Sequence, residues 1–180
     1  MKFVFIKTKI AGLTLVKPET GRDERGTFSE IYKLSVFKKA GLRDIFVQEN
    51  RSVSARGVLR GLHYQRGSFA QAKLVSCRRG KIFDVAADLR PGSRTFGRSF
   101  GVELSGENGL MLYVPPGCAH GFYALTDGAE VSYKCSKEYA PAHDAGVRWD
   151  DPGLAVKWPG KKPLLSPKDL ALPLLKDIKF

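Results

Sequence analysis

The stretch Gly57-Val58-Leu59-Arg60-Gly61-Leu62-His63-Tyr64-Gln65 places three side chains that can bind or catalyse within an otherwise apolar segment. Its valine, leucines and tyrosine favour an extended strand, in which Arg60, His63 and Gln65 need partners. A buried polar group without a partner costs about 1–3 kcal/mol, so we expect these three to face a pocket or to bond one another. Alternation puts His63 and Gln65 on one face and Arg60 on the other. A bulge near Gly61 would bring them together, because glycine tolerates the backbone angles that a bulge requires.

The segments that must position these side chains are short and extended. Turn signals rich in glycine and proline recur at about 8–12 residue spacing, which is typical of an all-β fold. Strands are predicted within residues 2–17, 27–32, 46–53, 57–65, 72–77, 82–89, 96–104, 109–114, 119–125 and 130–134, and a helix at residues 33–40. Strands without intervening helices indicate an antiparallel sandwich or barrel, best described as a jelly roll, in a single domain over residues 1–180. The proline-rich tail from Pro152 is expected to pack across the barrel and to include a short helix.

Composition narrows the possible functions. The net charge of +12 suggests anionic partners, but the basic residues are scattered and no recognition helix or aromatic RNA-binding motif accompanies them. A small phosphorylated ligand is therefore favoured over nucleic acid. No apolar run is long enough for a membrane span or a signal peptide, so a cytoplasmic protein without membrane partners is expected. Cys77, Cys118 and Cys135 form no C-x-x-C pair and are expected to be small buried thiols.

Ordered blocks along the chain resemble the dTDP-4-dehydrorhamnose 3,5-epimerase family. They are Arg25-Gly26 with Phe28 and Glu30, Gln48-Glu49-Asn50, Leu59 to Gln65, Lys73-Leu74-Val75, Phe83 to Ala86, Pro115 to Phe122, Tyr133-Lys134, Trp149 to Pro152 and Lys168-Asp169. The resemblance implies a cupin-like jelly roll, a homodimer that exchanges strands, and no metal or cofactor. It also implies inversion of the two carbons flanking the ketone of dTDP-4-dehydro-6-deoxy-D-glucose, giving dTDP-4-dehydro-L-rhamnose for dTDP-rhamnose biosynthesis.

Removal of a hydrogen from carbon beside a ketone requires a base, a partner for the enolate oxygen and an acid. His63 is the candidate base, because a neutral imidazole accepts a proton near pH 7. The resemblance makes Asp169 the carboxylate that orients its ring, with Asp84 as a second possibility. Lys73 is the candidate for stabilising the enolate oxygen. Tyr133 is expected to donate a proton to the opposite face of the sugar, which would invert the configuration.

The resemblance also assigns ligand contacts. Guanidinium and ammonium groups suit diphosphate oxygens. Tyr139 matches the ring that stacks on thymine, and Asp144 stands where many family members carry a glutamate that binds the nucleotide, so base selectivity is open. The remaining matched positions are Arg25, Arg60 and Lys168 for the nucleotide sugar, with Glu30, Gln48, Asn50 and His120 as polar contacts.

Three alternatives stay open at this point. Relatives that invert only one of the two carbons fit the same blocks. A metal-dependent cupin would need a cluster of histidines, whereas the residue two places after His63 is Gln65. A non-catalytic module that binds a sugar nucleotide or a nucleic acid would keep its function in His63→Ala.

Overall fold

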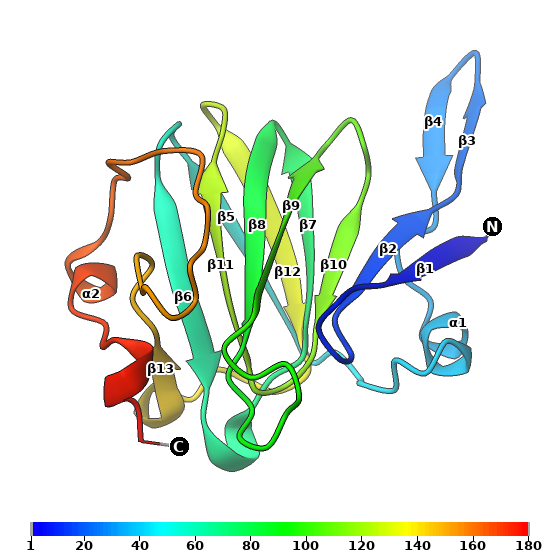
Figure 1. Ribbon diagram of the computed structural model, residues 1–180. Coiled ribbons are helices and arrows are strands. Elements are labelled where there is room, and N and C mark those ends of the chain that lie inside the picture. The colour runs from blue at the N-terminus through cyan, green and yellow to red at the C-terminus, as the bar shows by residue number, and fades with distance from the viewer. Residues whose placement is uncertain (1, 180) are drawn as a thin grey trace.

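Two antiparallel sheets face each other, and a hairpin stands away from them (Figure 1). The computed structural model describes residues 2–179. One sheet has the order β1 (Phe3–Lys7), β2 (Thr14–Pro18), β10 (Met111–Val114), β7 (Lys73–Arg79), β12 (Ala129–Cys135) and β5 (Gln48–Ser54). The other has the order β13 (Asp144–Gly146), β6 (Leu59–Gln65), β11 (Cys118–Ala124), β8 (Lys81–Asp88) and β9 (Ser99–Ser105). The predicted all-β jelly roll is confirmed.

Helical segments are few and short. They are α1 (Leu34–Lys39), α2 (Pro167–Leu170) and the single turns η1 (Gly67–Phe69), η2 (Pro141–His143) and η3 (Leu175–Asp177). The helix predicted at residues 33–40 is therefore present, and the helix in the tail covers four residues. None of the helices in residues 2–179 is long and apolar enough to span a membrane.

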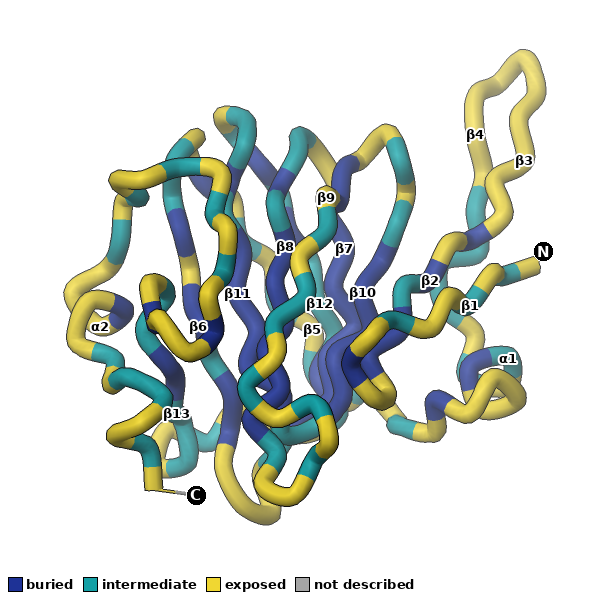
Figure 2. Tube along the Cα trace, viewed as in Figure 1, coloured by how far each residue is buried: buried dark blue, intermediate teal, exposed yellow. Residues whose placement is uncertain are grey.

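The core lies between the two sheets, where the tube in Figure 2 is dark blue. Val75, Ile82, Leu104 and Leu112 are fully buried there, and Phe122 is 3% exposed. Burying such side chains stabilises the fold by about 1.5–3 kcal/mol each. The free thiols of Cys77, Cys118 and Cys135 are also buried, as predicted.

The tail covers the outer face of the five-stranded sheet. Leu154, Trp158 and Leu175 pack with Leu62 and Val85 in one apolar cluster. The expectation that the tail crosses the barrel is confirmed, and this path carries the residues after Ser166 to the side of β6. On the outer face of the other sheet, α1 packs through its buried Phe37.

The N-terminal region differs from the prediction. Residues 2–17 form two strands joined by a turn, and residues 20–29 form the hairpin of β3 (Thr20–Asp23) and β4 (Gly26–Ser29). The strand predicted at 27–32 therefore ends at Ser29. This hairpin is exposed along almost its whole length (Figure 2), because it pairs only with itself.

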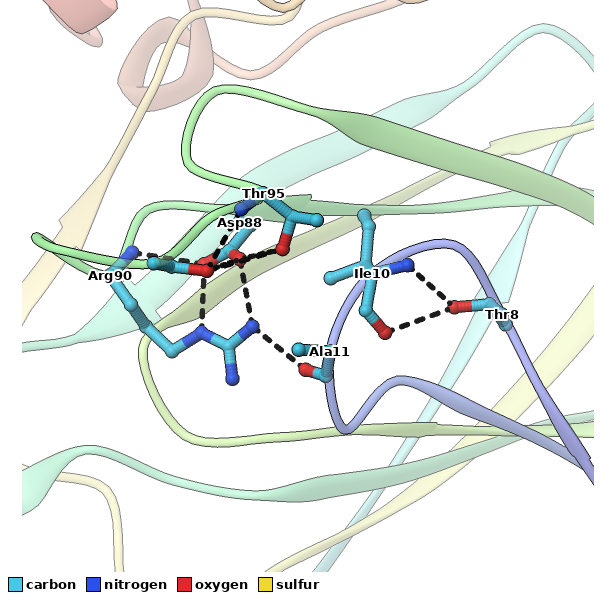
Figure 3. A network of polar contacts seen from close by, with 7 residues as sticks. Thr8, Ile10, Ala11, Asp88, Arg90 and Thr95 are labelled. Atoms are coloured by element: carbon cyan, nitrogen blue, oxygen red, sulfur yellow. Dashed lines mark hydrogen bonds and ion pairs between the residues drawn. The ribbon is translucent and has the colours of Figure 1, made fainter.

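The loop after β8 is fixed by a buried carboxylate, shown in Figure 3. Asp88 accepts hydrogen bonds from the guanidinium of Arg90 at 2.7 Å and from the hydroxyls of Ser93 and Thr95 at 2.6 Å. Arg90 also donates to the carbonyl of Ala11 at 2.8 Å, which joins this loop to the turn between β1 and β2. Burial acts to raise the pKa of Asp88, but these hydrogen bonds outweigh it and lower that pKa strongly.

Candidate active site

A cavity of about 660 Å³ opens between the sheets and is lined by β5, β6, β7, β11, β12 and the tail. Its volume lies within the range of about 300–1,000 Å³ that is usual for small-molecule sites. Eight of the residues singled out from the sequence line it together: Asn50, Arg60, His63, Lys73, His120, Tyr133, Lys168 and Asp169.

A register shift in β6 brings Arg60 and His63 to the same cavity. The pairing of β6 with β11 changes register between His120 and Phe122, opposite Gly61. Gly61 has φ +120°, and a Cβ atom there would lie 2.6 Å from Cα of Gly121. Only glycine fits this position.

Gln65 does not join the other two, so the expectation that all three polar groups share a pocket is wrong for this residue. Its amide is 4% exposed and bonds the backbone of the loop after β12 and of η1. The polar group is satisfied by backbone partners, which is the common fate of a buried amide.

His63 and Asp169 form a hydrogen-bonded pair. Nε2 of His63 lies 2.6 Å from Oδ1 of Asp169, and the histidine side chain is 30% exposed toward the cavity. Asp169 lies in the first turn of α2, where its backbone N–H donates to the hydroxyl of Ser166 at 3.1 Å. This cap fixes the carboxylate against the ring.

The surroundings of Asp169 favour its charged form. Burial acts to raise its pKa, but the hydrogen bond and the charge of His63, together with bonds from Ser166 and the backbone of Gly61, lower it overall. An ionised carboxylate only accepts hydrogen bonds, so Nε2 of His63 donates to Asp169 and Nδ1 is the nitrogen that this carboxylate does not engage. The free nitrogen is the one able to act as a base.

Asp84, the alternative partner of His63, lies instead against His120. Nε2 of His120 is 2.8 Å from Oδ1 of Asp84, and both side chains are buried. The second oxygen of Asp84 is buried and has no hydrogen-bond partner among the described residues. The carboxylate is thus committed to His120 through the pairing of β8 with β11.

Lys73 is buried next to His63, and Tyr133 is half-buried next to His120. Nζ of Lys73 donates to the backbone carbonyl of His63 at 3.2 Å. Burial lowers the pKa of Lys73, although Cys135, Asp144 and Asp84 act in the opposite direction. Burial raises the pKa of Tyr133, whose ring centroid is 6.4 Å from that of His120. The amino group of Lys73 and the phenol of Tyr133 are both available to donate hydrogen bonds in the cavity.

A second polar cluster continues from Lys168 at the rim of the cavity. The hydroxyl of Tyr139 donates to Oδ2 of Asp144 at 3.0 Å, and Nζ of Lys168 also contacts Asp144. Gln48 accepts from the backbone N–H of Tyr139 at 2.8 Å and donates to Asn50 at 3.0 Å. The predicted contacts on the nucleotide side are therefore joined by hydrogen bonds to one another.

Arg25 and Glu30 do not line the cavity of their own chain. Arg25 lies at the tip of the β3–β4 hairpin, is paired with Asp23 and has a side chain that is 84% exposed. Glu30 follows β4, 3.8 Å from Nζ of Lys33. These two matched positions are separate from the other predicted contacts within one chain.

Several contributing residues were not identified from the sequence. Ser52 lines the cavity with a buried hydroxyl that has no partner among the described residues, and Ser54 accepts from Nε of Arg60 at 3.1 Å. Ser166 caps α2 below Asp169. The motif Ser166-Pro167 was the available signal, because a serine before proline is typical of a helix start.

No group of three or more His, Cys, Asp or Glu side chains that could hold a metal ion occurs within residues 2–179.

The sequence and the fold both match known proteins. A model of the family described as dTDP-4-dehydrorhamnose 3,5-epimerase matches residues 7–177. The enzyme of that name from Methanothermobacter thermautotrophicus is 50% identical over 158 residues, which are 88% of this chain and 85% of the relative. The crystal structure of the Legionella pneumophila 3,5-epimerase in complex with dTDP-4-keto-L-rhamnose has a TM-score of 0.95 at 46% identity, covering 99% of this chain and 95% of that one. The dTDP-4-dehydrorhamnose 3-epimerase of Streptomyces niveus is 43% identical, over 89% of this chain and 78% of the relative. The chain belongs to the dTDP-4-dehydrorhamnose 3,5-epimerase family.

Proposed function

We propose that this protein inverts both carbons beside the ketone of dTDP-4-dehydro-6-deoxy-D-glucose, giving dTDP-4-dehydro-L-rhamnose for dTDP-rhamnose biosynthesis. The observation that carries the proposal is that His63, held by Asp169, and Tyr133 line one cavity. Family membership and the sugar nucleotide named for the Legionella complex identify the substrate class. The cytoplasmic setting stays the prediction made from the sequence.

The first step is removal of a proton from carbon. Nδ1 of His63 takes the proton from the carbon next to the ketone, and the electron pair moves onto the ketone oxygen as an enolate. Asp169 stabilises the imidazolium that forms. Lys73 donates to the enolate oxygen, and its burial strengthens this interaction because little water competes for the charge.

The second step returns a proton to the other face. The phenol of Tyr133 protonates the carbon of the enolate, which regenerates the ketone with the opposite configuration. Burial keeps the hydroxyl protonated at neutral pH, because it raises the pKa of Tyr133. The phenolate then recovers a proton from solvent, and His63 releases the one it took. Repetition at the second carbon completes the reaction.

The nucleotide end binds at the rim. Arg60 and Lys168 face the diphosphate, with Asn50 and His120 as polar contacts in the cavity and Gln48 bonded to Asn50 behind them. Tyr139, half exposed, presents its ring to thymine, and Asp144 fixes the hydroxyl of that ring. Asp144 is already bonded to Tyr139 and Lys168, so its part in base selectivity is indirect.

The proposal includes a homodimer, in which Arg25 and Glu30 of one subunit reach the cavity of the other. The β3–β4 hairpin stands off its own barrel (Figure 1). Its residue Phe28 is 70% exposed. The adjoining edge strand β1 exposes Val4 and Ile6. An exposed edge and an aromatic side chain favour pairing with a second copy, which would carry the hairpin to the partner's site.

Deuterium incorporation tests the reaction. The protein is incubated with dTDP-4-dehydro-6-deoxy-D-glucose in heavy water, and the labelled carbons are counted by NMR. Label at both carbons with inverted configuration is the expected result. Label at one carbon would identify a single-carbon epimerase, the activity named for the Streptomyces niveus relative. No label would reject the enzymatic function.

Mixing variants tests the hairpin exchange. His63→Asn and Arg25→Ala are each expected to be weakly active alone, and refolding them together should restore activity, because a mixed dimer contains one intact site. No recovery, together with a monomer in light scattering, would contradict the exchange.

A further inference from the structure

The segment that carries Tyr139 has no regular secondary structure. Residues 136–140 connect β12 to η2, and none of them belongs to a strand or helix. Backbone N–H and C=O groups in such a segment need partners other than a sheet ladder. The position of Tyr139 therefore depends on what binds this backbone.

The three glutamines of the chain all bind this segment. Gln71 donates to the carbonyl of Lys137 at 2.7 Å. Gln65 donates to the carbonyl of Glu138 at 3.2 Å and accepts from the N–H of Ala140 at 2.6 Å. Gln48 accepts from the N–H of Tyr139 itself. Four consecutive residues are thus held by side chains from three separate places in the sequence.

The amide group suits this arrangement for a chemical reason. A glutamine side chain both donates and accepts, so Gln65 can bind the carbonyl before Tyr139 and the N–H after it. It also donates to the carbonyl of Phe69 at 2.9 Å, which anchors the segment to η1. A glutamate of the same size would face two carbonyl oxygens with a negative charge.

Gln65 and Gln71 reach the site only through this backbone. Both are buried, at 4% and 8% exposed, and neither lines the cavity that holds His63 and Tyr133. The backbone of Gln65 also pairs with Asp144, whose carboxylate accepts from the hydroxyl of Tyr139. The loop backbone and the ring of Tyr139 are therefore both fixed from the same point of β6.

We propose that Gln65 and Gln71 are positioning residues for the nucleotide end of the site, which hold Tyr139 ready for the base and touch no substrate. This inference rests on the proposed function, in which Tyr139 stacks on thymine. Preorganisation of this kind improves affinity, because a segment that is already ordered loses little conformational entropy when the nucleotide binds. The two glutamines should then affect nucleotide affinity and leave proton transfer at His63 unchanged.

Calorimetric titration with dTDP tests the proposal. Gln65→Leu, which removes three backbone bonds, should weaken dTDP binding about tenfold, and Gln71→Leu, which removes one, about threefold. Gln65→Glu should weaken binding at least as much as Gln65→Leu. At saturating sugar nucleotide, kcat of the variants should stay within about twofold of the wild type while KM rises.

A double-mutant cycle separates positioning from general destabilisation. Tyr139→Ala should weaken dTDP binding, and Gln65→Leu should add nothing in that background, because its effect acts through the missing ring. The matched control is Asn108→Leu, since Asn108 also bridges three backbone groups, those of Ser105, Leu110 and Glu103, outside the cavity. This variant should bind dTDP normally.

The possible outcomes separate the positioning role of the glutamines from the proposed function. If the wild type binds dTDP, Tyr139→Ala weakens it and neither Gln65→Leu nor the milder Gln71→Leu does, the positioning role is wrong and the proposed function stands. Full additivity in the double variant, or an equal loss in Asn108→Leu, would also overturn the role. Failure of the wild type to bind dTDP would overturn both proposals.

Discussion

The histidines of two histidine–aspartate pairs line the cavity, and the two pairs differ in how they are built. Asp84 and His120 lie on the neighbouring strands β8 and β11, and their side chains are 0% and 6% exposed. Asp169 reaches His63 from the tail, 106 residues along the chain, and leaves 30% of the His63 side chain exposed. The strand pair is fixed by the sheet, whereas the other depends on a capped turn of helix.

The difference separates two uses of the same chemical pair. A base must contact its substrate and change its protonation state during turnover, which suits the exposed His63. A buried histidine held between strands offers one orientation and suits a fixed contact, which is the role proposed for His120. We infer that exposure of the ring, and not the presence of a carboxylate, distinguishes the base.

Replacing each histidine by asparagine should give the largest difference in activity between the two pairs. His63→Asn is expected to lower kcat by about 10³- to 10⁴-fold, because the proton acceptor is removed, with dTDP affinity kept. His120→Asn should lower kcat by about tenfold and raise KM, as loss of one polar contact would. Steady-state kinetics with calorimetry measures both; similar losses in the two variants would remove the distinction.

Tyr133→Phe should separate proton removal from inversion. His63 can still take the proton and return it to the same face, so deuterium exchange from heavy water should continue while inversion falls by about 10²-fold or more. NMR of the recovered sugar measures both quantities. Loss of exchange together with inversion would place Tyr133 before the enolate and contradict the assigned order.

The carboxylates should follow the same ranking with smaller effects. Asp169→Asn replaces the charged partner of His63 with a neutral amide that no longer stabilises an imidazolium, and we expect kcat to fall by about 10²- to 10⁴-fold. Asp84→Asn should cost about tenfold, since one oxygen of Asp84 already has no partner among the described residues. An Asp84→Asn variant less active than Asp169→Asn would reverse the ranking.

The smallest expected effect is on the pH dependence of stability, which should show the contribution of the ionised Asp169 beside His63. Because the pKa of Asp169 is lowered in the folded protein, its stabilisation is present above the unfolded value of about 4 and is lost as pH falls through the folded value. Asp169→Asn should therefore lose about 1.5–3 kcal/mol of unfolding free energy at pH 7, and the two proteins should converge in acid. Urea titrations from pH 7 to pH 3 measure this; a difference that grows in acid would be the wrong sign.

Much of the fold followed from local pattern. The turn signals set most strands of both sheets within a few residues, although β13 was not predicted, and the position of α1 was predicted by the run before Gly41. β4 overlaps the strand predicted at residues 27–32, but β3 was missed because its residues are polar or glycine, so no alternation marks it.

The sequence predicted which residues form the site better than it predicted which of them contact one another. Family blocks identified His63, Lys73 and Tyr133, and one cavity holds them. The choice between Asp84 and Asp169 depended on the path of the tail, which no local pattern encodes. Alternation also misplaced Gln65, because this residue ends β6, where its amide meets the backbone of η1 and of the loop after β12 instead of the cavity.

The route by which Asp169 arrives makes the enzyme vulnerable to a single cut. Residues 147–166 contain no helix and no strand beyond the isolated bridge at Leu164, and the lysines at 157, 161 and 162 are exposed along them. A protease that nicks this tether would sever the covalent link between the base and its carboxylate without cutting either sheet. During limited proteolysis, turnover should therefore fall before the circular dichroism signal does. Proton transfer would be lost while the barrel is still folded.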